Sequence, residues 1–247
     1  MLTYHHIFEL TNVSYEYIPN KVVLDNISLK INPSEQVAIL GSNGSGKSTL
    51  QKILAGLIFG KGDFIAFGQK ISPEIMKDKA FSAFFRKKVG ILFQNFEAQL
   101  LCPNVLDEIM FGPLLIGMSE KDAKKRAFEL LNLFDISHLK KAMPHHLSGG
   151  EKKKVALSSI LATNPEVLIL DEPTNDLDPK SQKLLFNILL NLHSAGKTII
   201  IATHNLEVAH NNNSRAIVID DTHQIIADGN IEDVLNDKQI LTKANLI

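Results

Sequence analysis

The sequence predicts an α/β fold in which helices cover a mostly parallel β-sheet. Three observations support this fold class. Short apolar runs typical of buried strands alternate with segments whose apolar residues recur at helical spacing. A glycine-rich loop lies directly between one such run and a helical segment. The 247 residues, 45% of them hydrophobic, are enough for one substantial core. Strands that alternate with helices favour parallel pairing, because each helix returns the chain for the next strand.

The first third of the chain is rich in predicted strands. Apolar patterning indicates strands at 7–14, 22–31, 36–40, 63–67 and 89–93. The strand at 36–40 leads into the glycine-rich loop, and the segment 47–57 then carries apolar residues at helical spacing. This order of strand, loop and helix is the context in which such a loop binds phosphate.

The glycine-rich loop matches the pattern G-x-x-x-x-G-K-[ST]. Its glycines let successive backbone N–H groups turn toward an anion, and the following helix adds a partial positive charge. We expect Lys47 to reach the β- and γ-phosphates of a nucleoside triphosphate, and Ser48 to supply a hydroxyl to Mg²⁺. The expected nucleotide-binding residues of this loop are Gly41, Ser42, Asn43, Gly44, Ser45, Gly46, Lys47, Ser48 and Thr49.

The middle of the chain is predicted to be helical. Residues 95–164 carry little strand signal, and Ser119 with Asp122 fits the start of a helix within them. Strands resume at 166–170, 197–202, 215–219 and 224–227, with a helix at 179–194. We therefore expect a single domain in which 1–94 and 165–247 form the α/β core, and 95–164 forms an inserted helical subdomain.

Two carboxylates, Asp171 and Glu172, follow the apolar run 167–170. Parallel sheets bind ligands at the carboxyl ends of their strands, so this position favours a functional role. Asp171 fits a ligand of Mg²⁺ that acts through the water shell of the metal. Glu172 fits the group that orients or deprotonates the attacking water. The alternative interpretation is an acidic turn at the surface.

A third group of residues begins a predicted helix near position 149. Ser148 and Glu151 fit a capping box, which is a structural role. Gly149 and Gly150 also fit the close approach of a phosphate to a helix N-terminus, and the two interpretations are compatible. We interpret the three lysines at 152–154 as a solvated face of the helix.

These motifs in this order resemble those of the nucleotide-binding subunit of an ABC transporter, over nearly the whole chain. The resemblance is carried by the phosphate loop, Gln94, the run 147–151, the run 171–174, the pair 177–178 and His204. It implies a P-loop NTPase core that includes an N-terminal antiparallel β-subdomain. It also implies an ATPase that uses ATP and Mg²⁺.

The resemblance further implies roles for individual residues. Gln94 is similar to the glutamine that senses Mg²⁺ and the membrane partner, which adds it to the metal residues Ser48 and Asp171. His204 resembles the switch histidine that contacts the γ-phosphate. Asp178 matches the loop that communicates across a dimer. We expect Tyr17 to stack on adenine, with Tyr15 as the alternative register. The expected catalytic residues are Glu172, His204, Gln94 and Lys47.

The family's mechanism implies that Ser148, Gly149, Gly150 and Glu151 act on ATP held by a second subunit. That subunit would be another copy of this chain or a related paralogue, and integral membrane subunits would respond to closure of the pair. Two positions depart from the common pattern: Glu151 replaces glutamine, and Lys154 replaces arginine.

A finer resemblance is to the ATPases of energy-coupling-factor and cobalt- or nickel-type importers. It is carried by 89–95, 99–101, 107–108 and 111–113, whereas 96–98 departs from it. It implies import of a transition-metal ion or a vitamin, with this chain at the cytoplasmic face of the membrane.

Composition argues against other classes of protein. The formal net charge of −1 disfavours a nucleic-acid partner, and no apolar run is long enough to cross a membrane. The single cysteine, Cys102, cannot form an internal disulfide. Two alternatives remain: a soluble ABC ATPase outside transport, and a module that holds ATP without turnover. The presence of Glu172 and His204 argues against the second.

Overall fold

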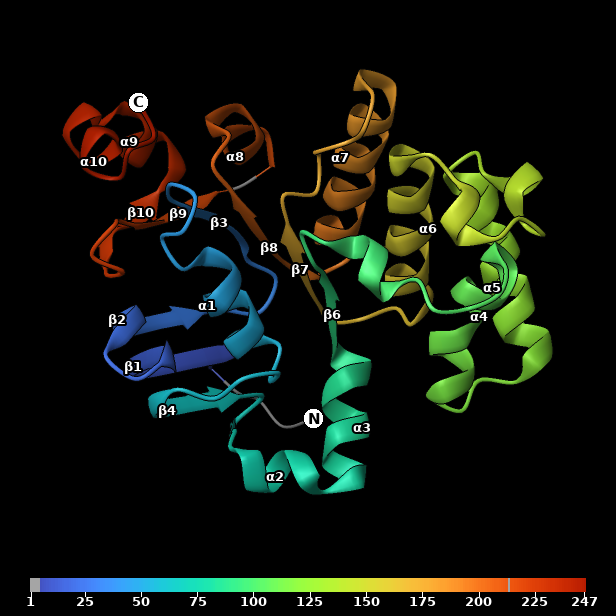
Figure 1. Cartoon of the computed structure of the whole chain (residues 1–247), viewed down its shortest axis with the longest axis horizontal. Helices are drawn as coiled ribbons and strands as arrows, with labels where there is room; N and C mark the ends of the chain where they lie inside the picture. The colour runs from blue at the N-terminus through green and yellow to red at the C-terminus, as the bar shows by residue number, and fades with distance from the viewer. Residues whose placement is uncertain (1–4, 213) are drawn as a thin grey trace.

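The computed structural model describes residues 5–212 and 214–247, which form two β-sheets flanked by helices (Figure 1). The smaller sheet is antiparallel, in the order β2-β1-β4-β5. Its strands are β1 (Phe8–Ile18), β2 (Lys21–Ile31), β4 (Lys61–Ala66) and β5 (Gln69–Lys70). The N-terminal antiparallel unit implied by the resemblance is therefore present.

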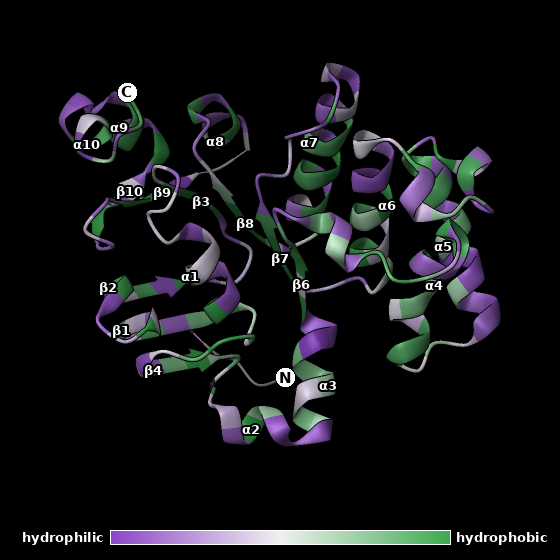
Figure 2. Ribbon diagram, in the orientation of Figure 1, coloured by the Kyte–Doolittle hydropathy of each residue, from purple (hydrophilic) through white to green (hydrophobic). Residues whose placement is uncertain are grey.

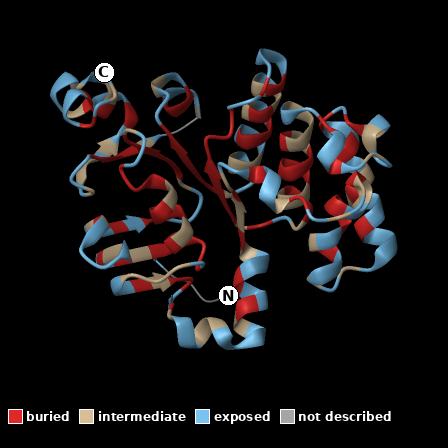
Figure 3. Ribbon diagram, viewed as in Figure 1, coloured by how far each residue is buried: buried red, intermediate tan, exposed pale blue. Residues whose placement is uncertain are grey.

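The larger sheet has six strands in the order β10-β9-β3-β8-β7-β6. The strands are β3 (Gln36–Leu40), β6 (Val89–Leu92), β7 (Val167–Asp171), β8 (Thr198–Thr203), β9 (Arg215–Ile219) and β10 (Ile225–Asn230). All pairs are parallel except β9 with β10. Every residue of β3, β7 and β8 is buried, which explains why these strands are continuous apolar runs (Figures 2 and 3).

Strand register brings the candidate chemical residues to one edge of this sheet. Leu40 pairs with Thr203, and Asp171 pairs with Ala202. The chain therefore leaves β3, β7 and β8 at neighbouring points, just where the phosphate loop, Glu172 and His204 follow. Because parallel strands end on the same side, residues more than a hundred positions apart in sequence meet there.

Helices pack on both faces of the six-stranded sheet. α1 (Lys47–Leu54) lies between the two sheets and shares a buried cluster with both, which includes Phe8, Leu50 and Ile217. α8 (Leu206–Asn212), α9 (Ile231–Asn236) and α10 (Lys238–Lys243) lie near β3 and β9. α7 (Pro179–Ser194) packs beside β8. The expected helix at 179–194 is confirmed residue for residue.

Three helices form the lobe at the right of Figure 1: α4 (Val105–Leu115), α5 (Glu120–Leu133) and α6 (Gly149–Ala162). No strand occurs between 95 and 164, as the sequence predicts, and Ser119 caps α5. The capping box of Ser148 and Glu151 at the start of α6 is also confirmed. The short helices are α2 (Pro73–Lys77), α3 (Lys79–Lys88), and the 3₁₀ turns η1 (Phe96–Gln99), η2 (Ser137–Leu139) and η3 (Pro144–His146).

Two local expectations need correction. β1 continues to Ile18 instead of ending at residue 14, because irregular pairing with β2 continues to Ile18, whereas pairing with β4 ends at Ser14. Lys153 is 1% exposed and not solvated, because α6 turns this position toward the core. Within the described residues, no helix combines the length and the apolar character needed to span a bilayer.

Candidate functional site

The phosphate loop joins β3 to α1 and is held in shape by Lys47. Its Nζ donates to the carbonyl oxygens of Gly41, at 2.7 Å, and Ser42, at 2.9 Å. Burial lowers the pKa of Lys47, and the charges of Glu172 and Asp171 oppose this change. Gly44 and Gly46 have φ values of 89° and 113°, which are costly for residues with a Cβ. The sequence pattern therefore produces a loop whose only cation is turned inward.

Residues near the C-terminus support this loop, and the sequence did not indicate them. The Ser42 hydroxyl donates to Asp221 at 2.6 Å, and His223 Nδ1 donates to the carbonyl oxygen of Ser45 at 3.1 Å. Both partners lie in the turn between β9 and β10. A Cβ added at Gly41 would lie 2.4 Å from the carbonyl oxygen of Ile219, so only glycine fits this close approach.

Asp171 faces the phosphate loop from the end of β7. The hydroxyl of Ser48 donates to Asp171 Oδ2 at 2.6 Å, which links the first turn of α1 to the strand. Burial raises the pKa of Asp171, the neighbouring Glu172 raises it further, and the hydrogen bond from Ser48 opposes this. The hydrogen bond from Ser48 therefore offsets part of the cost of holding the Asp171 carboxylate in this buried position.

Glu172 lies beside Asp171 and is held by the last residue of β8 and the residue that follows it. Its Oε2 accepts from the Thr203 hydroxyl at 2.8 Å. Its Oε1 accepts from the backbone N–H of His204 at 3.0 Å and lies 2.6 Å from His204 Nδ1. The Glu172 side chain is 6% exposed, whereas that of His204 is 49% exposed. The Glu172 carboxylate is therefore held by donors at the end of β8, and the His204 imidazole reaches the solvent. Thr203 was not expected from the sequence.

The phosphate loop, Gln94 and the two carboxylates line one polar cleft of about 260 Å³. The structure therefore brings together residues from the ends of β3, β6 and β7. Gln94 reaches the cleft because Leu92 pairs with Leu170. The lining residues are Val23, Asn43, Gly44, Gly46, Lys47, Ser48, Thr49, Gln94, Asp171 and Glu172.

The same cleft fits a magnesium ion. Ser48, Asp171 and Gln94 present a hydroxyl, a carboxylate and an amide, which are oxygen donors of the kind Mg²⁺ prefers. The described residues contain no cluster of three or more His, Cys, Asp and Glu side chains that could hold a metal. Mg²⁺ is commonly held by one carboxylate together with substrate phosphates, so this sparse donor set suits it.

The residues at the start of α6 lie apart from this cleft. Ser148 is not among the lining residues, and Figure 1 shows α6 and α1 on opposite sides of β7. Glu151 accepts from both the backbone N–H and the hydroxyl of Ser148, which lowers its pKa. A Cβ at Gly150 would lie 3.0 Å from the Asp176 carbonyl oxygen. A close contact within this chain therefore already favours glycine at this position.

Asp178 has a structural role in the isolated chain. It is the N-cap of α7 and accepts from the backbone N–H of Ser181 at 3.0 Å and from its hydroxyl at 2.6 Å. These bonds lower the pKa of Asp178.

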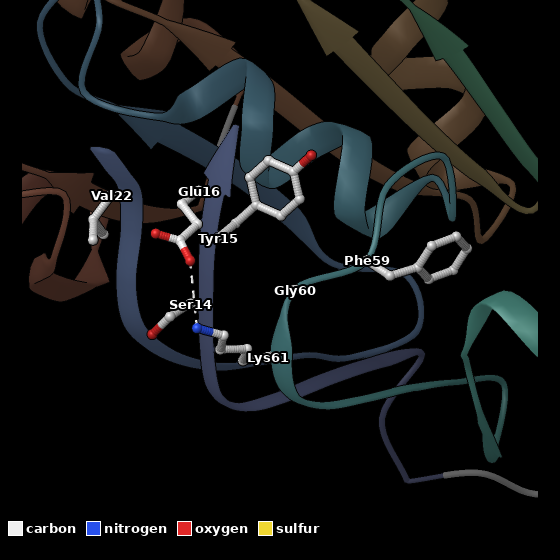
Figure 4. Close-up of a pocket in the computed structure, with 7 residues that line it drawn as sticks. All are labelled: Ser14, Tyr15, Glu16, Val22, Phe59, Gly60 and Lys61. Carbon is white, nitrogen blue, oxygen red and sulfur yellow. Dashed lines mark hydrogen bonds and ion pairs between the residues drawn. The ribbon is translucent and has the colours of Figure 1, made fainter. Parts of the chain in front are cut away.

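Tyr17 and Tyr15 occupy different environments at the end of β1. Tyr17 is 51% exposed, and its hydroxyl lies 3.4 Å from Thr49 Oγ1 at the phosphate-loop helix. Tyr15 instead lines a separate, mostly apolar cavity of about 220 Å³ beside Phe59 and the pair of Glu16 and Lys61 (Figure 4). The two rings meet edge to face, with centroids 4.9 Å apart. The position beside α1 therefore favours Tyr17 as the ring available to a nucleotide base.

Comparison with known proteins agrees with this geometry. The sequence model of the family described as "ABC transporter" matches residues 24–175. The chain is 50% identical, over 98% of its length and 89% of the relative, to a protein of Methanosarcina acetivorans named among ABC transporter ATP-binding proteins. It is 39% identical to the nickel import ATP-binding protein LarO of Lactiplantibacillus plantarum, over 89% of this chain and 91% of that one.

A solved structure shares the fold closely. The protein cbiO1 from Clostridium perfringens, part of the ABC transporter complex cbiONQ, superposes with a TM-score of 0.80 at 32% identity. The similarity covers 98% of this chain and 96% of cbiO1. The predicted P-loop NTPase fold is thereby confirmed.

Proposed function

Because the chain belongs to the ABC transporter family of ATP-binding proteins, we propose that it energises an importer of a transition-metal ion, cobalt or nickel, or of a vitamin. Its activity is ATP hydrolysis coupled to transport. The proposed ATP hydrolysis rests on the cleft that brings the phosphate loop together with Gln94, Asp171 and Glu172. Similarity to a nickel import protein and to cbiO1 supports the choice of an importer.

In this proposal the phosphate loop binds the triphosphate of ATP. The backbone N–H groups at the start of α1 and the Lys47 ammonium neutralise the phosphate charge. Nucleotide binding exchanges the two bonds from Lys47 to loop carbonyls for bonds to phosphate oxygens. The loop carbonyls thus hold the Lys47 ammonium beside the cleft before the substrate arrives, which lowers the cost of positioning it.

Ser48, Asp171 and Gln94 would hold Mg²⁺, which supplies charge neutralisation for the transferred phosphoryl group when bound. Glu172 orients the attacking water and accepts its proton. Three hydrogen-bond donors hold the Glu172 carboxylate, so it meets the water in one orientation. His204 is half exposed beside it and reaches toward the terminal phosphate.

The isolated chain presents only one half of each proposed ATPase site. Ser148 and the glycines after it start α6 away from the cleft lined by Lys47. In the proposed assembly they contact the ATP of a second subunit, and Asp178 lies at the contact between the subunits. Closure of the pair drives integral membrane subunits at the cytoplasmic face of the membrane.

Affinity capture from solubilised membranes tests the transport role. The tagged chain is expressed in its source cell, extracted in mild detergent and captured, and the bound proteins are identified by mass spectrometry. We expect integral membrane subunits to co-purify with it. Uptake of radioactive Ni²⁺, Co²⁺ or labelled vitamins by cells with and without the gene then identifies the solute. Recovery as a soluble ATPase with no membrane partner would support a role outside transport.

A further inference from the structure

Lys153 is a buried cation at the junction of three segments that line or flank the proposed ATPase site. Its side chain comes from the first turns of α6 and is 1% exposed. Its Nζ donates to the carbonyl oxygen of Glu172 at 2.9 Å and to that of Asn175 at 2.6 Å. The same nitrogen lies 5.0 Å from the centre of the Phe96 ring, two residues after Gln94.

Burying the ammonium group of Lys153 costs free energy, and packing alone does not account for that cost. Lysine is rarely buried completely, because removing its charge from water is costly. The charges that face it come from Asp176, Glu172 and Asp171. Burial nevertheless dominates and lowers the pKa of Lys153 to about 8. A leucine or methionine would fill the space without this cost, so packing alone does not explain the residue.

The backbone that Lys153 binds is unusual. Glu172 has a φ of 45°, in the left-handed region that residues with a Cβ rarely occupy. Its N–H donates to the carbonyl oxygen of Ala202 at 2.9 Å, and its own carbonyl oxygen accepts from Lys153. The backbone of Glu172 is therefore held at its N–H by β8 and at its carbonyl oxygen by α6. This arrangement sets the direction in which the Glu172 side chain leaves the backbone.

We propose that Lys153 is a positioning residue that ties the helix starting at Ser148 to the backbone of Glu172. This proposal rests on the ATPase function proposed above. Movement of α6 when a second subunit binds is transmitted through the two carbonyl bonds of Lys153 to the carboxylate that acts on water. The contact with Phe96 extends the link to the segment after Gln94. One side chain thus joins the helical lobe to both strand ends that carry the chemistry.

The test compares Lys153→Met with Lys125→Met, a matched change of an exposed lysine on α5. Methionine keeps most of the apolar stem and removes the donor. We expect Lys153→Met to lower kcat by ~30-fold to ~100-fold, because a misplaced general base loses that much. The KM for ATP, and the Kd of a fluorescent ATP analogue, should stay within about threefold, because the phosphate loop is untouched. Lys125→Met should behave as wild type.

Lys153→Arg provides the second variant if Lys153→Met folds poorly. A guanidinium group keeps the charge and the donors, so we expect it to retain more turnover than methionine. Its kcat should also stay level between pH 7.5 and about 9.5, whereas that of the wild type falls as Lys153 loses its proton. Wild-type kcat for folded Lys153→Met, or identical alkaline profiles for wild type and Lys153→Arg, would overturn the positioning role. Absence of turnover in the wild-type protein would instead refute the proposed ATPase function, and the positioning role with it.

Discussion

The Oε1 atom of Glu172 lies 2.6 Å from Nδ1 of His204, although the two residues are 32 positions apart in sequence. The contact forms because β7 and β8 are adjacent parallel strands that end together. Thr203 completes the arrangement by donating to the other carboxylate oxygen. Glu172 is therefore already held in place before nucleotide binds, which is the condition that an efficient general base requires.

Replacement of Glu172 with glutamine should separate binding from hydrolysis. Glu172→Gln keeps the size of the side chain and removes its basicity, so we expect kcat to fall by ~10³-fold. The Kd for ATP should stay within about threefold, because Lys47 and the loop are unchanged. Single-turnover hydrolysis and equilibrium binding measure the two effects, and gel filtration with ATP should show a stabilised dimer. Near-normal turnover would remove Glu172 from the proposed role.

Replacement of Lys47 with alanine should weaken nucleotide binding itself. The change removes a phosphate-binding cation and also two bonds that shape the empty loop. We expect the Kd for ATP to rise by ~10²-fold, in keeping with the loss of a charge-assisted contact. Titration with a fluorescent nucleotide checks this, with Lys124→Ala on the exposed side of α5 as the control. Unchanged affinity would contradict the role of Lys47.

Mixing two inactive variants tests whether α6 acts on the ATP of another subunit. Lys47→Ala disables the binding half, and a bulky change such as Ser148→Arg disables the α6 half. If two copies of this chain form the pair, a mixed dimer contains one site in which both halves are intact. We expect an equal mixture to regain up to about a quarter of wild-type turnover, because half of the dimers are mixed. Inactivity of the mixture, with dimers present, would favour action within one chain.

The base-stacking assignment predicts different effects at the two tyrosines. Tyr17 is exposed beside α1, whereas Tyr15 lines the separate cavity of Figure 4. We expect Tyr17→Ala to raise the KM for ATP by ~10-fold, the size of one stacking contact, and Tyr17→Phe to leave it unchanged. Tyr15→Ala should change the KM by less than about threefold while lowering thermal stability. The reverse pattern would assign the stacking role to Tyr15.

Because Lys153 is buried, we expect the free energy of unfolding to rise with pH over the range in which kcat falls. Its pKa falls from near 10.5 in the unfolded chain to about 8 in the folded protein. Between these values the unfolded chain binds more protons, so the free energy of unfolding rises with pH. We expect the wild type to gain ~1–3 kcal/mol relative to Lys153→Arg between pH 8 and 10, in urea unfolding. If the free energies of unfolding of the two proteins differed by the same amount at pH 8 and pH 10, Lys153 would not be buried as an ammonium ion.

Much of the fold could be predicted because its signals are local. The buried strands β3, β7, β8 and β9 are continuous apolar runs, and their predicted positions lie within a residue or two of the observed ones. The end of β1 was less predictable, because it depends on irregular pairing with β2 and not on apolar alternation within β1. The phosphate-loop motif and the caps at Ser119 and Ser148 can be recognised from residues a few positions apart, so they were also accessible.

By itself, the sequence determined the kind of chemistry: a phosphate loop, a pair of carboxylates after a buried strand, and a capped helix start. The tertiary structure alone decided which of these residues meet. Strand register placed Glu172 against His204 and Thr203, and helix packing turned Lys153 inward to the carbonyl oxygen of Glu172. The physical reason is the distance along the sequence over which each interaction acts. Backbone conformation and capping follow from neighbouring residues, whereas the burial of a lysine or the partners of a carboxylate depend on segments brought together only when the chain packs.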